Sequence, residues 1–134
     1  MDERIEERME EIDEYFGRLS TVREESEGVS REESEENLVR KISSAAIDIA
    51  SRIISLEGGG RPDTYAEYFR ELESRDVIDS DLRKRLEEMA RFRNLIVHQY
   101  HKIDSEELER IIEEDLDDVR EFLDAVRQYY SSQN

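Results

Sequence analysis

The sequence of 134 residues predicts an all-α fold: a bundle of four main helices and one short helix, in a single domain spanning residues 1–134. Three observations lead to this prediction. Residues that break helices are scarce, with five glycines and one proline, whereas Glu, Arg, Leu and Ile are abundant. Apolar residues recur at steps of three and four through most of the chain. The strict alternation of apolar and polar residues that is typical of strands is missing.

The first two predicted helices are long and amphipathic. One covers residues 2–24, and its apolar side is formed by Ile5, Met9, Ile12, Phe16 and Leu19. The polar segment 25–33 contains a glycine and is expected to connect this helix to the second one, at residues 34–56. The apolar side of the second helix is formed by Leu38, Ile42, Ala45, Ile49 and Ile53. Both helices would therefore bury one side in a shared core.

Two more helices follow the sequence Gly-Gly-Gly-Arg-Pro-Asp at residues 58–63, the clearest interruption of the helical pattern. Thr64 and Glu67 form a capping box that starts a short helix. Its inward side is expected to consist of Tyr65, Tyr68, Phe69 and Leu72. Ser80 is the expected N-cap of the fourth helix, which ends near His98. The inward side of that helix consists of Leu82, Leu86, Met89, Phe92 or Arg93, and Ile96.

A last helix begins at the capping sequence Asp-Ser-Glu-Glu, residues 104–107. Its inward side is expected to consist of Leu108, Ile111, Ile112, Leu116, Val119, Phe122, Leu123 and Val126. The chain shows no internal repeat and no sign of a second domain.

Acidic residues dominate the chain, whose formal net charge is −17. Residues 1–36 carry a net charge of −10 and residues 105–134 a net charge of −7, whereas residues 37–104 are neutral overall. Within that neutral part, residues 82–102 have a net charge of +4. Most of the surface would therefore repel a polyanion, which argues against broad coating of nucleic acid and leaves room for a local basic site.

The sequence also restricts the cellular compartment. The N-terminus is charged from its second residue, unlike a signal peptide, and no apolar run approaches the ~18 residues of a membrane span. The absence of cysteine excludes disulfides and thiolate metal sites. We therefore expect a cytoplasmic protein without a membrane partner.

Both histidines of the chain, His98 and His101, lie in one basic segment, residues 91–104. Arg93 and Tyr100 are seven residues apart, close to two helical turns, so they share a face if the helix continues. His98 follows Arg93 by five residues, an angle of about 140° on a regular helix. The three side chains therefore meet only if the helix ends or bends near His98, or if a second chain supplies the missing half.

These residue types suit a reaction at phosphate. The planar fork of an arginine can hold a phosphate, and a neutral histidine can accept a proton from a hydroxyl. Together they could cleave RNA without a metal: His98 would activate the ribose 2′-hydroxyl, and Arg93 would stabilise charge developing on the phosphate.

Structural interpretations of the same residues remain open, because the spacing of arginine and histidine is common. The histidine could simply cap a helix end. Tyr100 could pack its ring at an interface with its hydroxyl in water. Arg91 and Arg93 lie close in sequence to two glutamates. The two arginines could be solvated partners of Glu87 and Glu88.

A metal site formed by His98, His101 and Asp104 is a weaker alternative, because no matching ligand motif stands elsewhere in the sequence. The chain also has no Gly-rich phosphate loop before a helix and no nucleophile elbow. The basic segment is therefore the one candidate for chemistry.

The sequence RNLIVHQY at residues 93–100 resembles the Arg-x4-His-x-Tyr signature of the HEPN superfamily, specifically of its HepT-like toxins. The surrounding order is similar as well: RPDTYAEYFREL, the pair Val77-Ile78, and then RLEEMARFRNLIVHQYHKID. The resemblance covers residues 34–130, most of the chain. It implies an antiparallel HEPN-like bundle that forms a homodimer, with two signatures meeting across the interface.

The same resemblance implies a metal-independent endoribonuclease, the toxin of a type VII toxin–antitoxin system. Its expected partners are an RNA substrate and a minimal nucleotidyltransferase antitoxin, and no cofactor or metal is expected. Arg93 and His98 would be the catalytic pair, with Asn94 positioning the phosphate or the histidine. The antitoxin would transfer AMP to Tyr100, placing bulk and negative charge where the substrate phosphate must lie.

Arg91 and Lys102 are candidate phosphate contacts, and His101 receives no catalytic role. Because a net charge of −17 slows the approach of a polyanion, we expect a small, specific RNA target such as a tRNA end. The alternative function is a non-catalytic helical dimer that binds nucleotide or docks a nucleotidyltransferase. A purely structural bundle would leave the clustered Arg, His and Tyr unexplained.

Overall fold

The structure, a computed structural model, describes the backbone of residues 1–98 and 104–133 and the side chains of residues 1–91 and 104–133. All regular structure within these ranges is helical. The elements are α1 (Glu3–Glu25), α2 (Gly28–Leu56), α3 (Tyr65–Ser74), α4 (Ser80–His98), α5 (Ser105–Arg110), the π-helical turn η1 (Ile111–Asp115) and α6 (Leu116–Ser132). The predicted all-α bundle, with α3 as its short helix, is confirmed.

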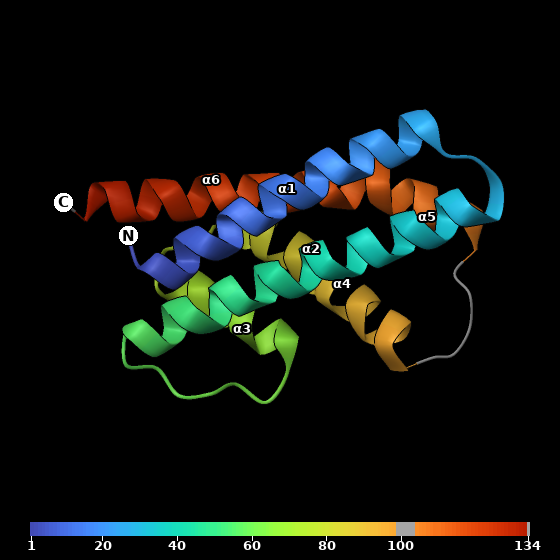
Figure 1. Cartoon of the computed structure of the whole chain (residues 1–134). Helices are drawn as coiled ribbons and strands as arrows, with labels where there is room; N and C mark the ends of the chain where they lie inside the picture. Colours follow the sequence, from blue (N-terminus) through green and yellow to red (C-terminus); the bar gives the residue numbers. More distant parts are fainter. Residues whose placement is uncertain (99–103, 134) are drawn as a thin grey trace.

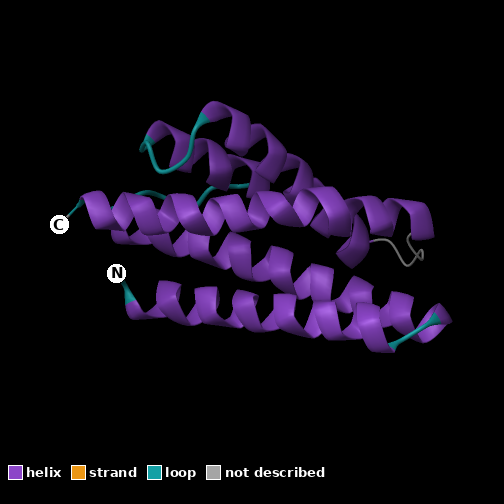
Figure 2. Ribbon diagram, turned by 90° about the horizontal axis from the view of Figure 1, so that it is seen from above, coloured by secondary structure: helices purple, strands orange, loops and turns teal. Residues whose placement is uncertain are grey.

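Helix α2 is the centre of the bundle. It contacts α1, α3, α4 and α6. Helices α1 and α2 run antiparallel as a long hairpin, and both termini of the chain lie at the same end of the molecule (Figures 1 and 2). Because four helices cover it, α2 is also the helix with the most apolar sequence: it buries Leu38, Val39, Ile42, Ala45, Ala46, Ile47, Ile49, Ala50, Ile53 and Ile54.

The connection between α1 and α2 is shorter than the sequence predicts. We expected a loop over residues 25–33, but α2 already begins at Gly28. The polar residues of this segment form ion pairs instead of a loop. Arg31 lies 3.2 Å from Glu35, and Glu35 is buried. The boundary was therefore wrong because polar composition alone does not distinguish a loop from a helix that is held by ion pairs.

The capping box before α3 is confirmed with one difference. The Thr64 hydroxyl accepts a hydrogen bond from the backbone N–H of Glu67 at 3.3 Å. The Glu67 carboxylate accepts from the N–H of Asp63 at 3.0 Å, one residue before the cap. The first bond satisfies a donor that the first turn of a helix leaves free, and the second holds the residue before the cap.

The prediction that Ser80 caps α4 is wrong. The cap is Asp79, whose Oδ1 accepts from the N–H of Leu82 at 2.8 Å, and Ser80 is the first residue of the helix. Aspartate and serine cap helices about equally well, so two adjacent candidates could not be separated by sequence.

The last predicted helix contains a π-helical turn at η1. Its apolar residues explain the turn, because Leu116 follows Ile111 by five residues, which would rotate it off the apolar side of a regular α-helix. A π turn bonds residues five apart and returns Leu116 to the core, where Ile111 and Leu116 are both buried. Ile112, which we expected inside, is only half-buried.

Helix α4 is fixed against α6 by a single arginine. Arg85 donates to Asp118, and to Glu121 at 2.8 Å, both on α6, and it lies 3.0 Å from Asp81 one turn earlier on α4. Burial raises the pKa of Asp118, whereas the Arg85 guanidinium acts in the opposite direction. Arg85 therefore joins two helices that share no local sequence.

A second arginine fixes α5, the helix that follows residues 99–103. Arg23 on α1 donates to Glu35 on α2 at 2.5 Å and to Glu109 on α5. The Ser105 hydroxyl donates to Glu32 on α2 at 2.5 Å. The start of α5 is therefore held against the end of the α1–α2 hairpin.

The substitution Glu109→Gln should lower the urea midpoint of unfolding at pH 7 more than Glu107→Gln does. Glu109 joins α5 to Arg23 of α1, whereas Glu107 on the same helix pairs only with Arg110, three residues away. Pairs within one helix contribute about 0.3–0.5 kcal/mol.

The stabilisation that Glu109 contributes should also depend on pH. The Arg23 guanidinium lowers the pKa of Glu109, so the stabilisation is present above the unfolded pKa of about 4.3 and is lost as the pH falls through the lower folded value. A gap between wild type and Glu109→Gln that stays constant down to about pH 2 would contradict this role.

Candidate functional site

The basic segment predicted to carry the chemistry lies at the end of α4. Arg93, Asn94 and His98 belong to this helix, and their side chains lie outside the described residues. Tyr100 and Lys102 lie outside the described residues altogether, as does His101. Which of these side chains meet therefore stays a prediction.

One condition for that prediction concerns the end of α4. The helix is described as far as His98, the last residue before the part of the chain that the structure does not describe. An end near His98 is one of the two ways in which an arginine and a histidine five residues apart could converge on one phosphate. The ion pairs of Arg85 and Arg23 hold the helix before this segment and the helix after it.

The basic segment carries fewer free charges than its sequence indicates. Arg83 pairs with Glu73 at 2.7 Å and with Glu87 at 3.3 Å, and Arg85 pairs with carboxylates of α6. In the described part of residues 82–102, the basic side chains without an ion pair to a described residue are Lys84 and Arg91. The net charge of +4 counted for residues 82–102 overestimates their free charge, because carboxylates of α3 and α6 form ion pairs with Arg83 and Arg85.

One alternative for Arg91 loses support. We considered Glu87 as its solvated partner, but Glu87 is buried and pairs with Arg70 at 2.8 Å as well as with Arg83. Arg91 is exposed and forms no ion pair with Glu87 or Glu88. It therefore keeps its charge available to a ligand.

The described residues contain neither a metal site nor a membrane-spanning helix. No group of three His, Asp or Glu side chains in residues 1–91 and 104–133 is arranged to hold a metal ion; the histidines of the predicted metal alternative lie outside these ranges. Within the described part of the chain, no helix is long and apolar enough to cross a membrane.

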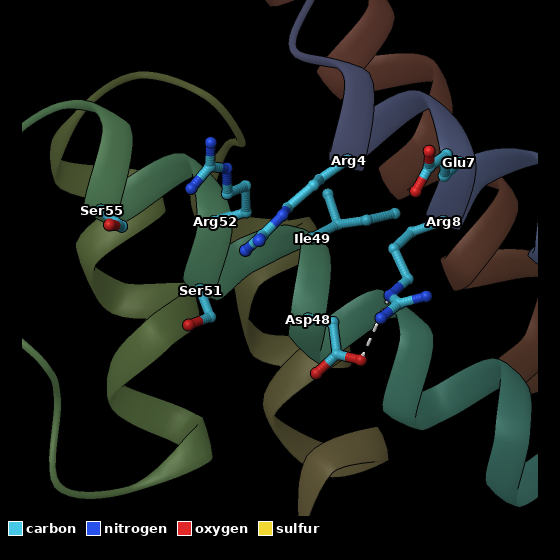
Figure 3. Close-up of a pocket in the computed structure, with 8 residues that line it drawn as sticks. All are labelled: Arg4, Glu7, Arg8, Asp48, Ile49, Ser51, Arg52 and Ser55. Carbon is cyan, nitrogen blue, oxygen red and sulfur yellow. Dashed lines mark ion pairs between the residues drawn. The ribbon is translucent and has the colours of Figure 1, made fainter.

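A polar pocket of about 600 Å³ opens between the start of α1 and the end of α2 (Figure 3). It is lined by Arg4, Glu7, Arg8, Asp48, Ile49, Ser51, Arg52 and Ser55. Arg52 holds Asp2 through two hydrogen bonds, of 3.1 and 3.0 Å, and Arg8 lies 3.5 Å from Asp48. No local motif in the sequence marks this pocket, because its two sides are forty or more residues apart in the chain.

Two curated relatives are similar to parts of this chain. The mRNA nuclease HepT of Shewanella oneidensis is 28% identical over 83 residues, which cover 62% of either chain. The tRNA nuclease HepT of Aphanizomenon flos-aquae is 36% identical over 69 residues, 52% of this chain and 47% of that protein. The matches thus span about half to three fifths of the relatives' lengths.

The fold has a close counterpart among solved structures. The tri-AMPylated Shewanella oneidensis HEPN toxin, in complex with its MNT antitoxin, superposes with a TM-score of 0.86 over 96% of this chain and 99% of that one. At 22% identity this likeness shows the fold alone.

A family model covers a much longer stretch than either relative. The model of the Ribonuclease HepT-like family matches residues 5–126, from the first buried residue of α1 to the last of α6. This chain therefore belongs to the Ribonuclease HepT-like family.

Proposed function

We propose that this protein is a metal-independent endoribonuclease, the toxin of a toxin–antitoxin pair. The observation that carries the proposal is the Arg-x4-His signature on the last turns of α4 in a chain of the HepT-like family. Arg93 and His98 are the catalytic pair, and Asn94 positions the phosphate or the histidine. Two chains form the active dimer, in which the two signatures meet in one cleft.

The reaction is an attack of the ribose on its own phosphodiester. His98 removes the proton of the 2′-hydroxyl, and the oxygen attacks the adjacent phosphorus. The bond from phosphorus to the 5′-oxygen breaks, leaving a 2′,3′-cyclic phosphate on one product and a 5′-hydroxyl on the other. Arg93 stabilises the negative charge that develops on the phosphate oxygens.

Regulation acts on the same site. A nucleotidyltransferase antitoxin transfers AMP to the hydroxyl of Tyr100, and the added phosphate occupies the place of the substrate phosphate. The tri-AMPylated state of the Shewanella toxin supports AMP transfer as the means of regulation. Arg91 and Lys102 are the candidate phosphate contacts, and the substrate is a small cytoplasmic RNA such as a tRNA. Of the two relatives above, one is named a tRNA nuclease and the other an mRNA nuclease.

His98→Ala should lower the rate of RNA cleavage by about 10²- to 10⁴-fold, the usual contribution of a proton-transfer group. Arg93→Ala should lower it by about 10²- to 10³-fold, because one donor that stabilises the developing negative charge is lost. His101→Ala should leave the rate within about twofold, because that histidine has no catalytic role. Helix content and dimerisation, measured by circular dichroism and light scattering, should not change. Cleavage should persist in excess chelator; a strict metal requirement would contradict the mechanism.

Co-expression with the antitoxin should add one or more AMP units to Tyr100, detected by peptide mass spectrometry. Tyr100→Phe should abolish the added mass and keep the nuclease active, because only the acceptor hydroxyl is lost. Tyr15→Phe, on α1, is the matched control and should be modified like wild type. If the wild-type protein expressed alone neither stops growth nor cleaves RNA, the non-catalytic binding dimer becomes the better description.

A further inference from the structure

The pocket of Figure 3 is one part of a longer concave surface along the end of α2. A second pocket shares Ser51 and Ser55 with it, and also contains Gly60 and Arg61. A third pocket shares Gly60 and Arg61 with the second, and reaches Arg70 on α3. We call this continuous surface the α2 groove. The described residues that line it come from the start of α1, the end of α2, the loop after α2 and α3.

Two arginines of the α2 groove have no acidic partner. The chain has 37 acidic and 20 basic residues, and most of its described arginines form ion pairs. Arg4 and Arg61 are exposed, and neither forms an ion pair with any described residue. In so acidic a protein, two arginines that line one groove and form no ion pair indicate a site for a negatively charged ligand.

The groove adds further hydrogen-bond donors. A guanidinium carries five N–H donors, and the two bonds from Arg52 to Asp2 occupy two of them. Ser51 and Ser55 lie one helical turn apart on α2, and their hydroxyls line both adjoining pockets. Arginine forks and hydroxyls are the groups that proteins place on phosphate oxygens.

The acidic residues that line the α2 groove belong to its two outer pockets: Glu7 and Asp48 to the first, Glu67 and Glu71 to the third. The middle pocket, between Ser51 and Pro62, has no acidic residue in its lining. Asp48 is held by Arg8, and Figure 3 shows Glu7 on the α1 side of the first pocket, away from Ser55. A phosphate in the middle of the groove would therefore meet arginine and serine rather than carboxylate.

The glycine run at residues 58–60 supports an open groove. Gly58 has a positive φ of 78°, and a Cβ on Gly59 would lie 2.7 Å from Ile54 Cγ2, so the backbone requires both. Gly60 has neither constraint: a Cβ there would meet nothing within 4 Å. Glycine at this position therefore leaves open space where two pockets adjoin.

We propose that the α2 groove binds the phosphodiester backbone of RNA, as a contact in addition to the proposed reaction site. This inference rests on the proposed ribonuclease function for its choice of ligand. The groove is open, polar and continuous through three pockets, which suits an extended chain better than an enclosed small molecule. Among its described lining residues the one aromatic is Tyr68, which is buried and offers no free ring face for a single nucleobase.

The test measures binding and does not depend on cleavage. Wild type and the double variant Arg4→Gln/Arg61→Gln are titrated with a labelled single-stranded RNA whose 2′-hydroxyls are methylated, because such an RNA cannot be cut. The double variant should bind roughly tenfold more weakly at low salt, and its slope of log affinity against log salt should be smaller by about 1.4. The control is Arg40→Gln, an arginine of α2 that is also exposed and lies outside the groove. It should bind within about twofold of wild type.

Three outcomes would overturn the proposal. One is equal affinity of wild type and double variant, and another is an equal loss in Arg40→Gln, which would mean a general charge effect. The third is displacement of the RNA from wild type by ATP but not by inorganic phosphate, which would assign the groove to a free nucleotide. A protein that binds methylated RNA through the groove yet cuts no RNA would refute the ribonuclease function and leave the groove in place.

Discussion

The bundle depends on arginines that reach carboxylates of more than one helix. Seventeen of its twenty basic residues are arginine, and against 37 acidic residues the folded chain must offset strong self-repulsion. Arg23 joins α1, α2 and α5, and Arg85 joins α4 and α6. An arginine fork can hold two carboxylates in a fixed geometry, which the single ammonium of a lysine does less well. The acidic excess thus supplies the partners that fix the helices.

These ion pairs also hold the helices on either side of the signature segment. Arg85 is on α4 upstream of Arg93, and it fixes that helix against α6. Arg23 and Ser105 fix the start of α5, downstream of Tyr100. The helices on both sides of the segment are therefore held by the bundle. The proposed reaction site would gain from such an arrangement, because preorganised flanks lower the cost of ordering the segment between them.

Local patterns in the sequence predicted what is local in the structure. Apolar spacing gave the helices and their buried sides, and the signature gave the candidate catalytic residues. The errors arose where distant residues decide: α2 begins early because Arg31 and Arg23 hold Glu35, and the basic segment is partly neutralised from α3 and α6. The α2 groove was missed for the same reason, since α1, α2 and the following loop supply its arginines. Single-sequence periodicity contains no information on such pairings.

Net charge is therefore a poor guide to whether this protein can bind RNA. At physiological salt a charge is screened beyond about 8 Å, so the acidic ends contribute little at a cation that has no carboxylate beside it. What matters is where such cations lie: among them are Arg91 on α4, Arg4 at the start of α1 and Arg61 in the loop after α2. An RNA that contacts both places must follow the surface between them. A protein with few free cations, set apart in this way, would select RNA by shape, whereas a uniformly basic surface would hold any strand.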